Sequence, residues 1–380
     1  QFNGDGGFDH MPAFIRADKV LVLGDRNQFS NVKTERASIA MNQTYKAQVL
    51  EQFRQEETPD ISQLNQIKMF DIKTSVLDFV ERIANLKIML RKHFRGYPEL
   101  IGFSSKFFYN NQLQAVKIRG KPIETVISFH KVEDDGEVDP IRNTNSREAN
   151  AIVEQLKSFA EKDAPPDCCV ITPHTEQQKF ILKQIMALPE GRELMDKLRL
   201  KIFTFDTCQG EERDTILYSM VATETSDRLN YIFPRTLDAH EDIEDNLRLQ
   251  RLNVGFSRAK ERIMFFHSKP LQEYKGSISD ALLFFENTLH SARSAPTAED
   301  VDPKSPMEAR VLGWLQQVPV LEELGDQVEV DAQFELGAYL KQLDRTYDHP
   351  NYKVDFLIRV SGETSSVQII VEYDGFKEHF

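Results

Sequence analysis

Between residues 91 and 268, short apolar runs alternate with longer segments of mixed polarity, and this alternation constrains the fold more than any other feature. Such runs lie at 168–171, 201–205, 215–221 and 262–267. Apolar runs of about four to eight residues, bounded by turn signals, are typical of strands that helices cover on both faces. We therefore predict an α/β fold in which 91–268 forms a doubly wound, mostly parallel sheet.

The string R-L-N-V-G-F-S-R-A-K at 251–260 precedes the last of these runs. Taken alone, it is also consistent with a basic helix start after a turn. It resembles the last motif of superfamily 1 helicases, R-L-N-V-A-x-[ST]-R-A, and so implies a RecA-like, P-loop NTPase fold. In that family the second arginine, here Arg258, reaches across a cleft between two lobes to the γ-phosphate of ATP. A planar, always charged guanidinium suits the charge that phosphoryl transfer spreads over equatorial oxygens.

A second string, V-L-V-L-G-D-R-N-Q at 20–28, indicates a buried strand that runs into a tight turn. It resembles the G-D-x-x-Q motif of the same helicases. The resemblance implies that Gly24, Asp25 and Gln28 lie at the nucleotide, where Gln28 senses the γ-phosphate.

The block L-R-K-H-F-R-G-Y-P-E-L-I at 90–101 comes next. It resembles the family block L-x-x-x-[YF]-R-x-x-P-x-[LI]-I, in which Arg95 would be a second γ-phosphate contact. The alternative is an amphipathic helix with basic residues on its solvated side.

Two further motifs follow in the family's order, at 168–177 and 201–214. The first resembles I-x-T-P-Y-x-x-Q, with His174 where tyrosine is usual; histidine could still stack on a base. The second resembles a loop that meets nucleic acid on one side and nucleotide on the other. Together they imply nucleic-acid contacts at Thr172, His174, Gln177, Thr204 and Thr207, and nucleotide contacts at Gln209, Gly210 and Glu212.

The ordered motifs resemble the Upf-like branch of superfamily 1, whose members translocate 5′ to 3′. No G-x-x-x-x-G-K-[ST] string, which would cradle phosphates, occurs in the sequence. We therefore expect the chain to be the later part of a larger polypeptide, cut within the first lobe and unable to hydrolyse ATP alone. The cofactors expected of the complete protein are ATP and Mg²⁺.

The C-terminal region carries a second pattern. Ser305-Pro306 followed by Glu308 predicts a helix start with a capping box. The segments 352–358 and 367–375 read as hairpin strands around the polar turn 361–366.

This order resembles PD-(D/E)XK nucleases of the small, Vsr-like branch, which have a restriction-endonuclease-like α/β fold. The resemblance implies Mg²⁺ ligands at Asp355 and Glu372, with Glu308, Asp374 and His379 in support. Asp374 stands where the usual lysine is found, although Lys377 could reach in. Otherwise, Glu308 is a carboxylate favoured at a helix N-terminus, and the hairpin carboxylates are edge charges that deter aggregation. The sequence stops at Phe380, before an expected final helix, so we predict a truncated module.

The predicted domain map has five parts. These are 1–40, the distal part of the first RecA-like lobe; 41–90, a helical connection; 91–268, the second lobe; 269–304, a polar linker; and 305–380, the nuclease-like domain.

Composition adds two observations. The three cysteines, Cys168, Cys169 and Cys208, show no metal-binding spacing, and no apolar run approaches membrane-spanning length; both favour a cytoplasmic protein. The net charge of −13 contrasts with the basic footprint expected of a nucleic-acid-binding domain. The last 80 residues hold 15 acids against 7 Lys plus Arg, so the excess is concentrated where a metal site is predicted.

We therefore predict an ATP-dependent helicase or translocase, acting on single-stranded or duplex DNA, with a tethered Mg²⁺-dependent endonuclease. By analogy with similar fusions, its setting would be bacterial defence or DNA repair. The expected partners are the N-terminal remainder of the polypeptide and, by the same analogy, a larger defence complex. Two alternatives stay open: an RNA-directed helicase with an inactive nuclease-like domain, and a non-catalytic scaffold.

Overall fold

The computed structural model describes most of the chain from residue 84 onward and forms two compact units, 1–90 with 240–254 and 91–239 with 255–380. The described residues are 19–28, 43, 44, 47, 48, 51, 77, 80, 81, 84–133, 136, 139–224, 226–237, 243–293, 296–348, 352–362 and 366–373. The helical connection predicted for 41–90 therefore falls largely outside them. The positions that are described between 43 and 81 are helical.

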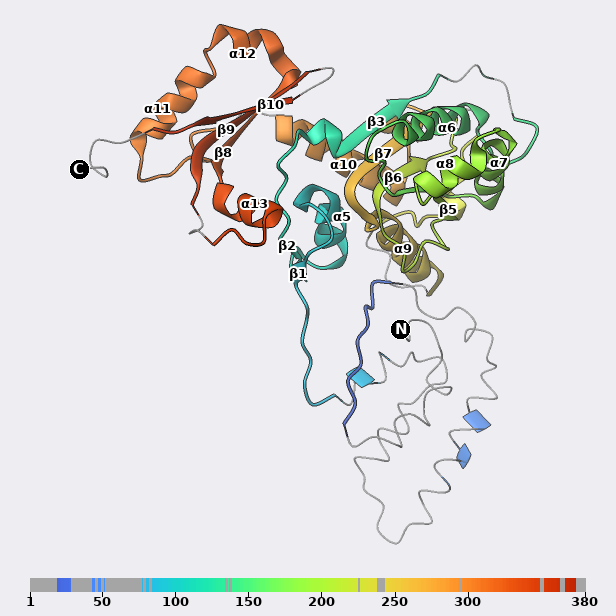
Figure 1. Ribbon diagram of the computed structural model, residues 1–380. Helices are drawn as coiled ribbons and strands as arrows, with labels where there is room; N and C mark the ends of the chain where they lie inside the picture. Colours follow the sequence, from blue (N-terminus) through green and yellow to red (C-terminus); the bar gives the residue numbers. More distant parts are fainter. Residues whose placement is uncertain are drawn as a thin grey trace. The chain divides into compact units, whose positions relative to one another are not determined.

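The larger unit contains a five-stranded sheet in which every pairing is parallel, as predicted (Figure 1). Its strand order is β3-β7-β6-β4-β5. The strands are β3 (Ile127–Lys131), β4 (Cys168–Thr172), β5 (Lys201–Thr204), β6 (Arg213–Ser219) and β7 (Ala259–His267). All five residues of β4 are buried, because helices cover the sheet on both faces.

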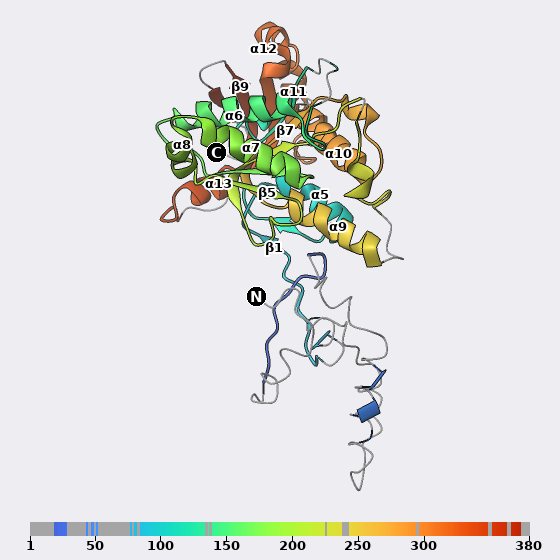
Figure 2. The ribbon, with the colours of Figure 1, turned by 90° about the vertical axis from the view of Figure 1, so that its right-hand side faces the viewer.

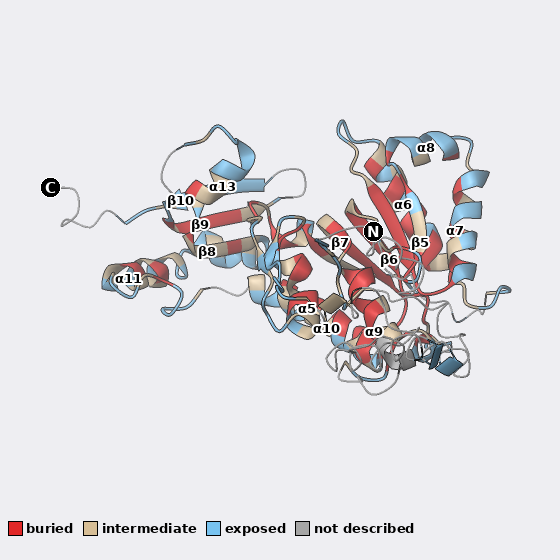
Figure 3. Ribbon diagram, turned by 90° about the horizontal axis from the view of Figure 1, so that it is seen from below, coloured by how far each residue is buried: buried red, intermediate tan, exposed pale blue. Residues whose placement is uncertain are grey.

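Helices α6 (Ser146–Ala160), α7 (Thr175–Ala187) and α8 (Gly191–Lys197) lie together over one face (Figure 2). Their apolar side chains pack with those of β4, β6 and β7 in one core cluster. Helices α5 (Pro98–Phe108) and α10 (Ser277–Arg293) cover the other face (Figure 3). Helix α9 (Ile243–Phe256) precedes β7.

Aromatic rings fill the space beneath α5 and α10. Phe103 contacts Phe256 and Phe285 at centroid distances of 5.6 and 5.9 Å, and Phe265 of β7 lies 5.4 Å from Phe285. Edge-to-face and offset packing of this kind adds about 0.5–1.5 kcal/mol per pair beyond area burial. Helix α10 is thus part of the core.

The segment predicted as a linker, 269–304, differs from that prediction. It contains the 17-residue helix α10, which follows the short 3-10 turn Leu271–Glu273. The buried side chains of α10 recur at helical spacing, and they are Ile278, Ala281, Leu282, Phe285 and Leu289. A polar, turn-rich stretch begins only after Arg293.

The C-terminal part forms a three-stranded antiparallel sheet of order β10-β9-β8. Its elements are α11 (Pro306–Leu315), α12 (Pro319–Leu324), β8 (Val328–Phe334), α13 (Leu336–Leu343), β9 (Val354–Ser361) and β10 (Ser366–Val371). The predicted hairpin is confirmed as β9 and β10. The capping box is wrong: Ser305 occupies the N-cap position, but its side chain makes no capping hydrogen bond. The Glu308 carboxylate instead accepts from Asp302 N–H and Gln333 Nε2.

A buried ionic network joins this sheet to the segment before β3. The Arg119 guanidinium contacts Glu99 at 2.6 Å and Glu329 of β8 at 2.8 Å. Arg359 of β9, fully buried, contacts Glu329 at 3.2 Å and Asp331 at 2.5 Å. The C-terminal sheet is therefore fixed to the parallel-sheet domain through charges on β8 and β9.

The remaining short elements complete the described chain. They are the parallel pair β1 (Lys92–His93) and β2 (Gln114–Ala115), and the 3-10 turns Ile123–Thr125, Leu229–Tyr231 and Gly325–Gln327. Among the described helices, none is long and apolar enough to cross a membrane.

Candidate nucleotide and nucleic-acid sites

Parallel pairing gives the five-stranded sheet two chemically distinct edges. The residues just before β6 and β7 share the N-terminal edge, whereas the residues just after β3, β4 and β6 share the C-terminal edge. The predicted nucleotide residues Glu212 and Arg258 fall at the first edge. The predicted nucleic-acid residues Thr172 and His174 fall at the second.

At the N-terminal edge, Arg95 is brought to residues far away in the sequence. Its Nε is ion-paired with Glu212, 117 residues away, and its Nη1 donates to the Ser257 carbonyl at 3.0 Å. Burial raises the pKa of the Glu212 carboxyl, but Arg95 and Lys260 outweigh it and hold that pKa below its usual value. Glu212 is thus a carboxylate that orients the Arg95 guanidinium.

Arg258 lies beside this pair and is only 3% exposed. Its Nη2 donates to Ser257 Oγ at 2.7 Å and its Nη1 to the Glu211 carbonyl at 3.4 Å. Burial lowers the pKa of Arg258, and the nearby positive charge of Arg95 lowers it further. Two guanidinium groups held near one another are electrostatically suited to an anionic group with several oxygens.

His93, which the sequence argument passed over, borders the same cluster. Its pKa falls to about 4, first because of burial and then because of Arg95. Gly96 N–H donates to His93 Nε2 at 3.2 Å, so the neutral ring accepts at that nitrogen. A side chain at Gly96 would place its Cβ 2.9 Å from the Ala259 carbonyl. This close approach explains the glycine after Arg95.

The loop between β5 and β6 supplies the other predicted nucleotide residues. Gly210 has φ of +79°, a left-handed conformation that favours glycine. The Gln209 side-chain nitrogen is buried without a hydrogen-bond partner in the described structure. An unsatisfied buried amide is uncommon in native proteins, and a bound ligand is one way to satisfy it.

Gly255 departs from the alanine that is usual in the helicase motif, and the structure gives a reason. A Cβ at this position would lie 2.1 Å from the Phe205 ring, which is fully buried. The Phe205 ring therefore occupies the volume that an alanine methyl group would need.

Gly24, Asp25 and Gln28 belong to the other compact unit. Gln28 Nε2 donates to Asp25 Oδ2 at 2.9 Å, and Asn27 N–H donates to Asp25 Oδ1 at 3.0 Å. The turn is also held by α9, because Gln250 Nε2 donates to the Arg26 carbonyl at 2.9 Å. Asp25 thus closes the predicted tight turn. The buried strand predicted before it is wrong, because residues 20–23 form no strand and Leu21 and Leu23 are exposed.

At the C-terminal edge, Thr172 of β4 and Thr204 of β5 are partners in register. Thr207 Oγ1 accepts from Thr204 N–H at 3.0 Å, and the two hydroxyl oxygens lie 3.2 Å apart. The Thr172 hydroxyl is buried without a partner in the described structure. The structure therefore brings together three threonines from motifs that are distant in sequence.

Gln177 is fully buried, and its amide is used within the protein. Its Oε1 accepts from Asn145 N–H at 2.9 Å, and its Nε2 donates to the Asn145 carbonyl at 2.9 Å and to Ser219 Oγ at 3.0 Å. His174, immediately before α7, lines a surface pocket instead. Burial lowers the pKa of His174.

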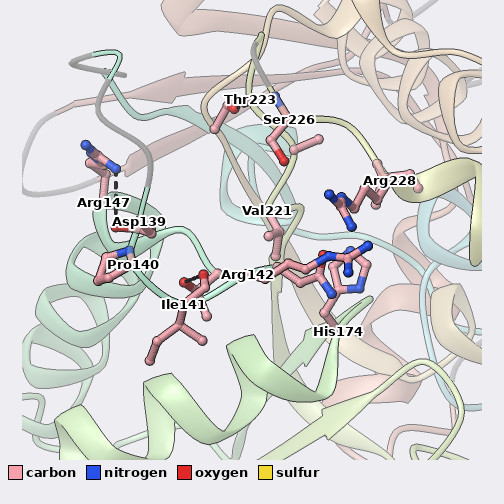
Figure 4. Close-up of a pocket in the computed structure, with 14 residues that line it drawn as sticks. Asp139, Pro140, Ile141, Arg142, Arg147, His174, Val221, Thr223, Ser226 and Arg228 are labelled. Atoms are coloured by element: carbon pink, nitrogen blue, oxygen red, sulfur yellow. Dashed lines mark hydrogen bonds and ion pairs between the residues drawn. The ribbon is translucent and has the colours of Figure 1, made fainter.

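The pocket has a volume of about 220 Å³ and is formed by the loops after β3, β4 and β6 (Figure 4). Arg142 and Arg228 extend toward His174 from two sides of it. The polar residues Asn143, Thr144, Thr223 and Ser226 also line it. Sequence reasoning missed both arginines, because they lie in loops without a recognisable pattern.

Beneath this pocket lies Glu148, a completely buried carboxyl group that the sequence did not single out. It accepts from Ser219 Oγ at 2.7 Å and from Val221 N–H at 2.8 Å. Burial raises its pKa to about 8, although these hydrogen bonds act in the opposite direction. Glu148 ties the start of α6 to the end of β6.

The predicted nuclease residues are only partly described. Asp374 and His379 fall beyond residue 373, the last one described. Asp355 Oδ2 accepts from Tyr373 N–H at 2.6 Å, and Glu372 follows the last paired residue of β10. Glu308 lies on α11, which packs on the face of the sheet that contains Phe356, whereas side-chain alternation turns Asp355 toward the other face. No cluster of three or more metal-binding side chains occurs among the described residues.

A known protein family matches the part of the chain that contains both sites. The family model of the AAA domain (AAA_12) matches residues 72–269, just over half of the sequence. The chain belongs to this AAA domain family. The matched segment includes Arg95, Glu212 and Arg258 as well as the C-terminal-edge pocket.

Curated relatives are similar over a larger part of the chain. An uncharacterized ATP-dependent helicase, MG140, of Mycoplasma genitalium is 23% identical over 72% of this chain and 23% of its own length. A putative helicase of Danio rerio, mov-10-B.2, is 24% identical over 69% of this chain and 27% of its own length. The chain thus spans about a quarter of the length of these relatives. The family and the relatives together support a superfamily 1 helicase.

Among solved structures, the C-terminal domain of a possible DNA helicase from Lactobacillus plantarum is similar over 49% of this chain and 96% of that domain. The sequence identity is 11% and the TM-score 0.25, an overlap too weak to establish a shared fold.

Proposed function

We propose that this chain supplies the second motor lobe of an ATP-dependent helicase or translocase that moves along nucleic acid. The supporting observation is the cluster of Arg95, Glu212 and Arg258, because it collects two guanidinium groups from distant motifs at one edge of the sheet. The pairing of Arg95 with Glu212 fixes one group, and burial fixes the other.

In this proposal Arg95 and Arg258 contact the γ-phosphate of ATP, and Glu212 keeps Arg95 in position. An arginine so placed stabilises charge that develops on the equatorial oxygens and contributes about 10³–10⁵ in rate in comparable systems. Gln209 and Gln28 are further nucleotide contacts.

ATP hydrolysis by the full-length protein, with and without single-stranded DNA or RNA, tests the proposal. We expect strand-stimulated turnover that falls at least about 10³-fold in Arg258→Ala and is not restored in Arg258→Lys, since lysine lacks the planar fork. Arg192→Ala, at an exposed position of α8, is the matched control and should retain wild-type turnover. A change of less than about twofold in Arg258→Ala would contradict the assignment.

We further propose, as a second function, Mg²⁺-dependent cleavage of DNA by the C-terminal sheet. The supporting observation is the strand register, in which Val371 pairs with Phe356, so that Glu372 follows next to Asp355. Neighbouring residues on antiparallel strands have Cβ atoms about 4.5–5.5 Å apart. Two carboxylates at that separation are suited to Mg²⁺, which proteins commonly bind through one or two carboxylates. DNA as the substrate rests on the resemblance to DNA nucleases.

Cleavage of circular single- and double-stranded DNA in Mg²⁺ tests this second function. We expect nicking by the wild-type protein and its loss in Asp355→Asn and in Glu372→Gln. Glu335→Gln removes an exposed carboxylate from the same domain and should cut normally. Equal cleavage by all four proteins would leave an RNA-directed motor with an inactive domain as the better account.

A further inference from the structure

The C-terminal-edge pocket collects positive charge with little to balance it. Of its lining residues, all of them described, Asp139 is the one acid. Both Asp139 oxygens are used locally: Oδ1 accepts from Ser146 Oγ at 2.7 Å and Arg147 Nη1 at 3.4 Å, and Oδ2 accepts from Ser146 N–H at 2.6 Å. Among the residues that line the pocket, no carboxylate is therefore paired with Arg142 or Arg228.

Two guanidinium groups that line the same small pocket repel each other unless an anion lies between them. Arginine matches phosphate oxygens through paired N–H donors, which makes phosphate the best-fitting class of anion. Ser226 N–H donates to Thr223 Oγ1 at 3.1 Å, which orders the third side of the pocket. The arrangement is thus polar, cationic and preformed.

The floor of the pocket is held in an unusual backbone conformation. Val221 has φ of +68°, which is rare for a β-branched residue. The Glu148 carboxyl group accepts from Val221 N–H and from Ser219 Oγ, and Asn145 Nδ2 donates to Ser268 Oγ at 2.8 Å. A buried network of this kind maintains a strained residue, and such strain clusters at ligand sites.

The pocket also adjoins the predicted path of the strand. His174 follows β4 directly after Thr172 and Pro173, and Thr172 is the register partner of Thr204. A largely buried, neutral imidazole offers a flat surface for a base or a sugar.

We propose that this pocket binds one phosphodiester group of a single-stranded nucleic acid, with Arg142 and Arg228 on the phosphate oxygens and His174 against the adjoining base or sugar. The proposal rests on the proposed helicase function. It assigns two loop arginines, from the segments after β3 and β6, to the same phosphate.

The test is the salt dependence of oligothymidylate and oligouridylate binding by the full-length protein, followed by fluorescence anisotropy. For single strands, the slope of log K against log salt changes by about 0.7 for each phosphate neutralised. We expect Arg142→Gln/Arg228→Gln to lower the magnitude of the slope by about 0.7. Arg142→Lys/Arg228→Lys, which keeps both charges, should retain the slope. Arg192→Gln, which removes one exposed charge outside the pocket, is the control and should behave as wild type.

His174 gives an independent readout. His174→Ala should weaken binding by roughly tenfold without changing the salt slope, because stacking is not a counterion effect. His174→Tyr, which restores the residue usual in the helicase motif, should bind at least as well as wild type. Circular dichroism spectra of all variants should match, since Arg142 is exposed and Arg228 half-buried.

Three outcomes overturn the proposal and can be told apart. If the wild type binds strands and the double glutamine variant keeps the Arg192→Gln slope, the pocket assignment fails while the helicase function stands. If the wild type binds neither oligonucleotide, both fail. If inorganic phosphate at matched ionic strength raises the melting temperature of the wild type but not of the double variant, and strands do not bind, the pocket takes free phosphate instead.

Discussion

Glu329 gives the sharpest prediction about how the C-terminal sheet is held. Its side chain is 2% exposed and accepts from Arg119 at 2.8 Å, from Arg359 at 3.2 Å and from Ile123 N–H at 2.7 Å. Burial lowers the pKa of Arg119, but the charges of Glu99 and Glu329 outweigh it and raise that pKa. The two acids therefore stabilise the charged form of Arg119 in the interior.

Glu329→Ala removes the shared carboxylate and leaves two buried cations. Breaking a buried ion pair by removing one partner destabilises by about 3–5 kcal/mol. Arg119 retains Glu99 and Arg359 retains Asp331, so we expect the lower end, about 3 kcal/mol. With a urea m-value of about 1–3 kcal/mol/M, the midpoint should fall by about 1 M or more.

The assay can separate the domains, because the sequence contains one tryptophan, Trp314, and it lies on α11 of the C-terminal part. Urea unfolding followed by Trp314 fluorescence should show the full loss in Glu329→Ala. The double variant Glu329→Gln/Arg359→Met should lose less unfolding free energy than the sum of the two single variants. Each single change leaves the other residue of the pair buried without its partner, and the double change does not. Glu335→Ala, which breaks an exposed pair with Lys353, is the control and should stay within about 0.5 kcal/mol. A loss below about 1 kcal/mol in Glu329→Ala would refute the reasoning.

Two further predictions concern the parallel-sheet domain. The pKa of Glu148 is raised from 4.5 to about 8, so the folded state holds this proton more tightly than the unfolded chain; its contribution to stability is present below about pH 4.5 and is lost as pH rises to about 8. Glu148→Gln mimics the protonated acid, so its urea midpoint minus that of wild type should increase from pH 5 to pH 8. A difference that does not change with pH would contradict the assignment. Gly255→Ala should destabilise the fold by about 1–3 kcal/mol in thermal unfolding, because its methyl group would overlap the Phe205 ring. Adding Phe205→Leu should recover part of this loss. An unchanged melting temperature in Gly255→Ala would rule out the overlap.

The apolar runs predict the parallel sheet, whereas the resemblance to helicase motifs predicts that Arg95, Glu212 and Arg258 lie at one nucleotide site. Apolar runs such as 168–171 specify buried parallel strands, and parallel strands bring distant loops to the same edge. The polar stretch after α10 favours a linker for the whole of 269–304, although Ile278, Ala281, Leu282 and Phe285 have helical spacing.

Other features have no local signature. Glu148 is an ordinary acid in the first turn of an amphipathic helix, and only the fold places it under Val221. Arg142 and Arg228 lie in loops separated by 86 positions, so their convergence depends on strand order. The predicted nuclease carboxylates are recognised by residue type, but residue type alone does not specify which face of the sheet each side chain occupies.

The central claim is that this chain forms part of a motor driven by ATP. The most direct measurement is displacement of streptavidin from the biotinylated end of a single strand by the full-length protein, on DNA and on RNA. We predict displacement with ATP, none with a non-hydrolysable analogue, and loss in Arg258→Lys. Displacement that is absent with ATP, or that persists undiminished in Arg258→Lys, would contradict the motor assignment.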